Sequence, residues 1–472
     1  MPHSFRFLLG LPMAAALLAP GITVAAPVSQ ADRDQARAML EQIISIRTLA
    51  GEGQVPRMAE VLANRLKEAG FRDEDIRLVP VDKDGERTVG LVVRYQGSDD
   101  SLRPVAILGH MDVVGAIPAN WQTEPFTPTE KDGYLYGRGA VDNKAGVAAV
   151  VSSFARLKRE GFQPERTLLI AFSGDEETGM ATTRALTEDP WVSKSVIALN
   201  SDAGSGAVSD GKYEFSIQSA EKTYATFFLS AANEGGHSSA PKAENAIYDL
   251  AAALQNLSEL RFPVEFNEIT RPAVAKLAAD KGGEFGEALN TLLRDPRDSA
   301  ARAVAERYPE YSNILWTTCV PTMLAAGNAP NALPQNATAT VNCRIFPGTS
   351  VESVRQNIVN TIQDPEISVV LDGEPVVSPV SPPHEDLFAL LTRAVHVNYP
   401  GASVMPSMSS GGTDGRQFRS AGIPTYGAGS LALKRPEDSR AHGIDERVPL
   451  EAFYKELNYW DYLLREVGSM KL

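Results

Sequence analysis

Three short apolar runs in the first half of the chain constrain its fold more than any other feature. They occupy residues 104–108, 167–172 and 196–199. Each is a continuous run of the type that is buried on both faces of a parallel sheet. A helical pattern with apolar residues Val147, Val150, Val151 and Phe154 separates the first run from the second. Strands that alternate with helices predict an α/β fold with a mainly parallel sheet.

A different pattern interrupts this alternation in the middle of the chain. Strand-like material occupies residues 213–229, helical patterns cover residues 245–257 and 351–362, and residues 313–346 read as two strands around a turn. The α/β pattern resumes after residue 375, where residues 386–398 read as a helix. We therefore predict an α/β domain of residues 32–212 and 375–472, with an inserted α+β domain of residues 213–374.

Metal-ligand residue types follow each of the three apolar runs. His110 follows the first run, Glu176 and Glu177 follow the second, and Asp202 follows the third. The sites of open parallel sheets lie beyond the carboxyl ends of their strands, so these side chains are expected at one edge. Asp142 and His442 can complete the set. His442 must return to that edge from 240 residues beyond Asp202 (442 − 202 = 240).

Each of these residues alone has an ordinary explanation as a loop histidine, an acidic turn or a helix cap. Together they supply two imidazoles and enough carboxylates for two divalent cations, with one carboxylate left over as a base. Asp112 lies two residues after His110 and can accept its second N–H. Glu176 and Glu177 are adjacent and should point in different directions, so that one binds metal and the other moves a proton. The sequence predicts metal-assisted hydrolysis.

The chain resembles the co-catalytic zinc exopeptidase family of acetylornithine deacetylase, succinyl-diaminopimelate desuccinylase, the aminoacylases and carboxypeptidase S. The stretches GYLYGRGAVDNK at 133–144, ATVNCRIFPG at 339–348 and AHGIDE at 441–446 look closest to the carboxypeptidase S branch. The resemblance implies a mainly parallel-sheet catalytic domain with an inserted lid domain that often mediates dimerisation.

The resemblance also implies a role for each site residue. Asp142 bridges two zinc ions, for which cobalt or manganese can substitute, and its bond to Asn143 is cis. The other implied ligands are His110 with Asp202 on one metal and Glu177 with His442 on the other. Glu176 is the implied general base for attack by metal-bound water, and Asp112 supports His110.

For substrate recognition, the resemblance implies that His237 reaches the active site of a partner copy and stabilises the oxyanion. Arg344 matches an arginine that binds a substrate carboxylate. The alternative is that Arg344 is an arginine on the surface of a strand, without a role in binding. Asn331, Gly412 and Thr413 match substrate-contact positions. The implied substrates are short peptides or N-acyl amino acids with a free carboxylate next to the scissile amide.

Three other functions remain open from the sequence. Asp at position 202 resembles the peptidase members, whereas the SGGTDG loop at 410–415 resembles the desuccinylases, so a deacylase without peptidase activity is one alternative. A second is an inactive binding protein of the same fold. A third is a glycosidase that uses an acid pair without metal.

Composition and the N-terminus bear on partners and location. The net charge is −14 and no basic run occurs, which argues against a nucleic-acid or anionic-membrane partner. Residues 1–26 read as a signal peptide, with an apolar stretch at 7–18 and small residues at 23–26. We therefore expect export, to the periplasm or outside the cell, without stable membrane insertion after signal removal. An uncleaved anchor is the alternative.

The two cysteines, Cys319 and Cys343, are equally spaced from Asn331 in the predicted turn (331 − 319 = 12; 343 − 331 = 12). If Asn331 lies near the hairpin centre, they face each other and can form a disulfide under oxidising conditions. Two buried thiols are the alternative.

Overall fold

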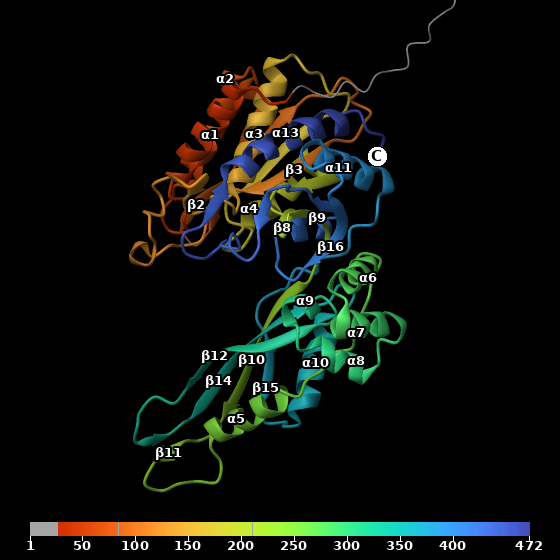
Figure 1. The fold of residues 1–472 in the computed structure, drawn as a ribbon. Coiled ribbons are helices and arrows are strands. Elements are labelled where there is room, and N and C mark those ends of the chain that lie inside the picture. Colours follow the sequence, from red (N-terminus) through yellow and green to blue (C-terminus); the bar gives the residue numbers. More distant parts are fainter. Residues whose placement is uncertain (1–26, 84, 210) are drawn as a thin grey trace, which may run out of the picture.

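The three apolar runs form neighbouring parallel strands in a 10-stranded sheet (Figure 1). The computed structural model describes residues 27–83, 85–209 and 211–472, so the predicted signal peptide lies outside the described residues. The runs correspond to β3 (Val105–His110), β6 (Leu168–Ser173) and β7 (Ile197–Asn200). Every residue of these strands is buried, which explains why the runs are continuously apolar.

The large sheet extends on both sides of these strands. Its other members, from one edge to the other, are β1 (Ile76–Lys83), β2 (Glu86–Tyr95), β17 (Thr425–Gly427), β9 (Lys212–Glu221), β8 (Ser205–Ser209) and β18 (Ala432–Lys434), with β16 (Ser403–Ser409) paired to β9. The central strands β6, β3, β7 and β17 run parallel. A small three-stranded sheet combines β4 (Thr129–Lys131), β5 (Tyr134–Tyr136) and β19 (Arg447–Pro449).

Helices cover both faces of the large sheet. One face packs on α1 (Gln30–Ile44), α2 (Val55–Glu68), α3 (Lys144–Arg159), α11 (Glu385–Asn398) and α13 (Leu450–Val467), and the other on α4 (Ala181–Glu188) and α12 (Gly415–Ser420). Alternate residues of β3 enter opposite cores, with Ile107 on the first face and Leu108 on the second. The predicted α/β class is confirmed. Within the described residues, no helix combines the length and the apolar character needed to cross a bilayer.

The second lobe is built on an antiparallel four-stranded sheet with its own core (Figure 1). Its strands, in spatial order, are β12 (Thr318–Ala326), β14 (Asn336–Ile345), β10 (Thr223–Ala232) and β15 (Ser368–Leu371), and β11 (Gly236–His237) pairs with β13 (Ala332–Leu333) at one end. Its helices are α5 (Ala246–Leu257), α6 (Thr270–Lys281), α7 (Gly283–Arg294), α8 (Ser299–Ala305), α9 (Pro309–Ser312) and α10 (Val351–Ile362).

The chain passes from one sheet to the other at Lys222. The predicted boundary at 212/213 falls at the start of β9, which belongs to the large sheet, so we propose a boundary at Lys222 instead. On the return path, the N–H of Asp372 still donates to Thr226 of β10, whereas the N–H of Ser381 donates to Ser219 of β9. The proposed return at residue 375 lies between these two bonds.

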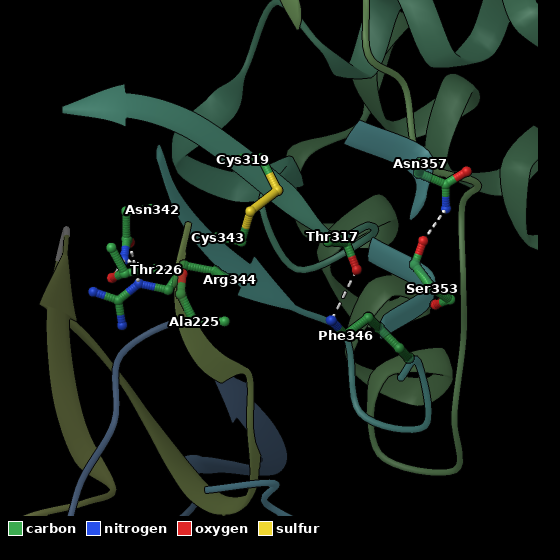
Figure 2. Close-up of a disulfide and its surroundings, with 10 residues drawn as sticks. All are labelled: Ala225, Thr226, Thr317, Cys319, Asn342, Cys343, Arg344, Phe346, Ser353 and Asn357. Carbon is green, nitrogen blue, oxygen red and sulfur yellow. Dashed lines mark hydrogen bonds between the residues drawn. A yellow bond between two sulfur atoms is a disulfide. The ribbon is translucent and has the colours of Figure 1, made fainter. Parts of the chain in front are cut away.

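Cys319 and Cys343 form a disulfide between β12 and β14 (Figure 2). They are directly opposite in the antiparallel register, with 4.1 Å between their Cα atoms. Of the two alternatives, the disulfide is confirmed. The register shifts by one residue between Pro321 and Met323, so the pairing of the two cysteines depends on this bulge as well as on their spacing from Asn331.

Glu456 gives the folding stability a pH dependence. Its carboxylate is 1% exposed and accepts hydrogen bonds from the N–H and hydroxyl of Ser430 and from the indole of Trp460. Burial raises the pKa of Glu456 from 4.5 to about 7. Between these values the folded chain holds a proton that the unfolded chain has released, so stability falls as pH rises.

We expect Glu456→Gln to remove this contribution. The free energy of unfolding of the natural chain, relative to the variant, should fall by on the order of 3 kcal/mol between pH 4 and pH 8. Urea unfolding at both pH values measures the difference. The control is Glu466→Gln, at an exposed position of the same helix, which should keep the pH dependence of the natural chain. Equal slopes for all three proteins would contradict the prediction.

Candidate metal centre

The carboxyl ends of β3, β6 and β7 bring ligand-type side chains to one edge of the large sheet. His110 ends β3 and pairs in register with Ser173, the last residue of β6. Leu108 of β3 pairs with Asn200, which ends β7 two residues before Asp202. The predicted meeting of the three strand ends is therefore confirmed by the register.

One group of ligand atoms surrounds His110, which is 1% exposed. Its Nε2 lies 2.9 Å from Oδ1 of Asp142 and 3.4 Å from Oδ1 of Asp202. Its Nδ1 lies 3.0 Å from the backbone carbonyl oxygen of Asp112 and 3.6 Å from the carboxylate of that residue. An N–H at Nδ1 that donates to this carbonyl leaves the lone pair of Nε2 directed at Asp142 and Asp202.

A second group surrounds His442, which returns from the C-terminal segment to this edge. Its Nε2 lies 2.9 Å from Oε1 of Glu177 and 3.2 Å from Oδ2 of Asp142. The two histidines therefore contact different oxygens of one carboxylate, that of Asp142. One ligand atom from each of His110, Asp142 and Glu177 fits within 4.8 Å of the others. The peptide bond between Asp142 and Asn143 is cis, as the resemblance implied.

Asp112 orients the two adjacent glutamates. One oxygen of its carboxylate accepts the N–H of Glu176 and the other accepts the N–H of Glu177, both at 3.1 Å. The side chain of Glu177 contacts His442, whereas that of Glu176 forms no hydrogen bond or ion pair with any described residue. The two side chains thus have different partners, as expected. Asp112 differs from expectation, because its backbone carbonyl rather than its carboxylate is the nearest acceptor for His110.

The environment of the site changes the pKa values of its carboxyl and imidazole groups. Burial raises the pKa of Asp202 to about 6 and that of Glu176 well above its usual range. Hydrogen bonds to Asp142 and Glu177 raise the pKa of His442 to about 10. The packed carboxylates therefore stabilise positive charge between them.

The donor set fits two divalent cations. When each imidazole is neutral with its proton on Nδ1, the Nε2 lone pairs face carboxylate oxygens at 2.9–3.4 Å, which is repulsive unless a cation lies between them. Imidazole nitrogen and carboxylate oxygen are the ligands that zinc takes in catalytic sites. Asp142 contacts both histidines, so one carboxylate can serve two ions.

Glu446 joins the loop of His442 to the loop of Asp142, and it was not predicted as a site residue. It is fully buried. Its carboxylate accepts the backbone N–H groups of Gly139, Val141 and Asp142, at 2.9, 2.8 and 3.0 Å. It also forms an ion pair of 2.7 Å with Arg138. The AHGIDE stretch that carries Glu446 indicated the family resemblance and a histidine ligand, but not this contact of its glutamate.

Three predicted substrate contacts lie near the junction of the two lobes. Arg344 stacks on Tyr224, and its guanidinium donates to the carbonyl of Ser410 and to the side chain of Asn342 (Figure 2 shows the last pair). Gly412 follows Ser410 by two residues. The structure therefore brings Arg344 to the Gly-rich loop.

Thr413 lies in the same loop, but its side chain already forms hydrogen bonds within the protein. Its hydroxyl donates to Oε1 of Glu221 at 2.6 Å and accepts from the amide of Asn200 at 3.1 Å. Glu221 is fully buried and also pairs with Arg419 at 3.0 Å. Glu221 was not predicted as a site residue, and no signal in its local sequence distinguishes it from an ordinary strand end.

Asp414, next in the loop, is a second residue without a predicted role. It is 2% exposed and accepts hydrogen bonds from the hydroxyls of Ser173 and Thr183. Burial raises the pKa of Asp414 to about 7. These bonds fix the loop against the end of β6, beside the metal ligands.

The remaining two predicted residues lie together elsewhere. His237 belongs to β11 and is exposed, with its Nδ1 bonded to Ser239. The carbonyl of Asn331 accepts the N–H of Ser238. Figure 1 shows β11 at the end of the second lobe that points away from the large sheet. Within one chain, His237 and Asn331 are not brought to the metal ligands.

The chain is similar in sequence to known peptidases and N-acyl amino acid hydrolases over most of its length. A sequence profile of the peptidase family M20/M25/M40 matches residues 106–466. The chain is 32% identical over 384 residues to the Xenopus tropicalis protein named N-fatty-acyl-amino acid synthase/hydrolase PM20D1, across 79% of this chain and 74% of that protein. It is 28% identical over 391 residues to probable carboxypeptidase S-like 2 of Dictyostelium discoideum, across 79% and 74% of the two chains.

Solved structures show the same fold. The M20 family metallo-carboxypeptidase Sso-CP2 of Sulfolobus solfataricus has a TM-score of 0.69 at 16% identity, over 92% of this chain and 99% of the other. The di-peptidase Dug1p of Saccharomyces cerevisiae has a TM-score of 0.66 at 17% identity, over 93% and 97%. Because the profile match spans most of the sequence, this chain belongs to the peptidase family M20/M25/M40, whose members are metal-dependent hydrolases of peptides or N-acyl amino acids.

Proposed function

We propose that this chain is an exported di-zinc hydrolase that cleaves an amide bond next to a free carboxylate, in short peptides or N-acyl amino acids. The observation that carries the proposal is the arrangement of Glu176 and Glu177. One glutamate contacts a histidine within the ligand cluster, while its neighbour keeps a side chain without a partner among the described residues. A catalytic metal site requires such an unligated base beside its ligands.

The proposed ligand sets follow the contacts of Asp142. Asp142 would contact both ions, His110 and Asp202 would hold one of them, and Glu177 and His442 would hold the other. The 2.9–3.4 Å contacts around the two imidazoles support this division. Zinc held there would polarise the scissile carbonyl and acidify the attacking water.

In the proposed mechanism, Glu176 takes the proton from the attacking water and then gives it to the leaving amine. Burial raises the pKa of Glu176 well above its usual range, which strengthens its carboxylate as a proton acceptor. Asp112 serves as a positioning residue, since its two oxygens fix the backbone of both glutamates.

Arg344 is the proposed partner of the substrate carboxylate. Its Nε and Nη1 are engaged with Asn342 and Ser410, and its Nη2 has no hydrogen-bond partner among the described residues. The backbone N–H of Gly412 would assist, whereas that of Thr413 already donates to the carboxylate of Glu221 at 3.2 Å. A planar guanidinium matches a carboxylate well.

His237 is the proposed oxyanion donor, supplied by a second copy of the chain. Its exposed position, together with Asn331, at the end of the second lobe suits contact with another molecule rather than with its own metal ligands. A two-fold dimer through the inserted domain would exchange these residues reciprocally. Export rests on the sequence of residues 1–26 alone.

A substrate screen on the zinc-loaded protein tests the proposed function. The panel contains dipeptides, N-acyl amino acids and matched C-terminally amidated compounds. We expect hydrolysis of the free acids, loss of activity with a chelator, and recovery with zinc or cobalt. The amidated compounds should react at least about 10-fold more slowly, because they lack the carboxylate that would form a charge-assisted pair with Arg344. Equal rates for acids and amides would contradict carboxylate recognition, and activity without metal would contradict the mechanism.

A further inference from the structure

A chain of hydrogen bonds between buried side chains joins Glu221, the last residue of β9, to the proposed metal ligand Asp202. Its two middle members are Thr413 of the Gly-rich loop and Asn200 at the end of β7. Glu221, Asn200 and Thr413 are 0%, 1% and 8% exposed, so water does not compete for these bonds. The mechanism described so far does not use this chain, although it ends on a residue that would hold zinc.

The carboxylate of Glu221 sets the direction of the first bond. The hydroxyl of Thr413 lies 2.6 Å from its Oε1, and the backbone N–H of Thr413 donates to its Oε2 at 3.2 Å. The carboxylate also accepts the amide of Gln218 at 2.7 Å and pairs with Arg419 at 3.0 Å. A carboxylate paired with a guanidinium only accepts hydrogen bonds, so the hydroxyl of Thr413 must donate its one proton to Glu221.

That bond, together with two others, uses every hydrogen-bonding position of the Thr413 hydroxyl. A hydroxyl has one proton and two lone pairs. The oxygen of Thr413 accepts the side-chain amide of Asn200 and the backbone N–H of Gly415, both at 3.1 Å. The hydroxyl therefore has no position left for a substrate, although the family resemblance placed Thr413 among the substrate contacts.

The orientation of Asn200 follows from the same constraint. Because the oxygen of Thr413 presents lone pairs, the NH2 group of Asn200 must face it, and the amide oxygen must face the other way. That oxygen accepts the N–H of Asp202 at 3.1 Å. Asn200 is itself held in register by β3 on one side and β17 on the other. A strand end thus fixes the backbone from which Asp202 reaches Nε2 of His110, at 3.4 Å.

We propose that Thr413 is a positioning residue for the metal ligand Asp202, acting through Asn200, and that its side chain does not contact the substrate. Glu221 holds the hydroxyl in the donor orientation that this role requires. Residues that orient metal ligands contribute about 10- to 100-fold to metal affinity or activity. The inference rests on the part of the proposed function that assigns Asp202 to a zinc ion, and it does not depend on the identity of the substrate.

Zinc affinity of the full chain, measured by competition with a chromogenic chelator, tests the proposal without a substrate. Thr413→Val keeps the shape of the side chain but removes the hydroxyl. We expect one of two zinc ions to bind about 10- to 100-fold more weakly to this variant. Thr413→Ser keeps the hydroxyl and should bind zinc as the natural chain does. If the valine variant does not fold, Thr413→Ala gives the same comparison with a smaller side chain.

The matched control is Thr425→Val in β17. The hydroxyl of Thr425 is also fully buried, but it donates to the backbone carbonyl of Ile423 and contacts no metal ligand. This variant should lower the Tm of the metal-free protein, as Thr413→Val does, without changing the zinc affinity. In Thr413→Val the loop keeps two other attachments, because the N–H of residue 413 still donates to Glu221 and Asp414 still accepts two hydroxyl groups.

Kinetics at saturating zinc separate positioning from substrate contact. For a dipeptide or N-acyl amino acid that the natural chain cleaves, Thr413→Val should keep the natural KM, because the side chain touches no substrate. A raised KM at saturating zinc, with an unchanged zinc affinity, would overturn the proposal and return Thr413 to the substrate contacts.

The zinc measurements also separate this proposal from the proposed function. If the natural chain binds two zinc ions but cleaves none of the panel, the proposed function fails, and the zinc affinities still decide the role of Thr413. Equal affinities in Thr413→Val and the natural chain would overturn that role and leave the function intact. An equal loss in Thr413→Val and Thr425→Val would reveal a general effect of lost stability and would overturn it too. If the natural chain binds no zinc, both proposals fail.

Discussion

Replacing Glu176 with Gln should lower kcat by about 100- to 10,000-fold, the range expected for loss of a general base. Gln keeps the shape of the side chain but cannot take a proton from water. The backbone bond of residue 176 to Asp112 does not depend on the side chain, so the local structure should be retained. Metal content should also be unchanged, because Glu176 lies outside the ligand cluster.

Steady-state kinetics and metal analysis of the purified variant check this prediction together. The matched control is Glu188→Gln, an exposed glutamate at the end of α4, which should keep both activity and metal. A Glu176→Gln variant that loses its metals would show that Glu176 is a ligand rather than the base. A variant with a near-normal rate would rule out the proposed role altogether.

Replacing His237 with Ala should lower kcat by about 100- to 1,000-fold, the usual effect of removing one oxyanion donor. The fold and the metal content should be preserved, since His237 is exposed and its side chain bonds only to Ser239 within the described chain. KM should change little, because the donor acts when charge develops on the carbonyl oxygen.

Co-expression of two inactive variants tests whether His237 acts across a dimer. When His237→Ala pairs with Glu176→Gln, one of the two sites regains an intact Glu176 and an intact His237 from its neighbour. Random pairing should then restore about a quarter of the natural activity, since half the dimers are mixed and each has one working site. If His237 served its own chain, both sites would stay defective. A dimeric mixture without recovery would therefore contradict the proposal, as would a monomer with full activity.

Local sequence determined the elements that carry the site. The helix predicted at residues 351–362 is α10, where Ser350 caps the first turn and Val354, Ile358 and Ile362 repeat at helical spacing. The strands β3, β6 and β7 were recognised because burial on both faces requires a continuous apolar run. By contrast, β1 has only half-buried and exposed residues, so no apolar run distinguished it.

The kinds of ligand residue were also evident from the sequence, since imidazole and carboxylate side chains follow the strand ends. Residue types and spacing did not show which of them meet, although the resemblance implied that Glu177 and His442 share a metal. The return of His442 to Glu177 depends on packing of segments 265 residues apart. The hydrogen bond from the hydroxyl of Thr413 to Glu221 joins residues that are 192 positions apart. These contacts removed Thr413 as a free side-chain donor while leaving Arg344 beside the Gly-rich loop.

The sequence by itself determined the α/β class, the inserted block and the chemistry of the metal-ligand set, because each depends on residue type and short-range periodicity. Residue types and spacing did not decide which glutamate joins the cluster, and the resemblance implied Glu177, which contacts His442 in the structure. The tertiary structure alone decided that Glu446 fixes the loop of Asp142. The physical reason is that loop side chains take their direction from hydrogen bonds to distant segments. Asp112 holds two backbone groups more than 60 residues away, at separations of 64 and 65, and no local pattern encodes such a bond.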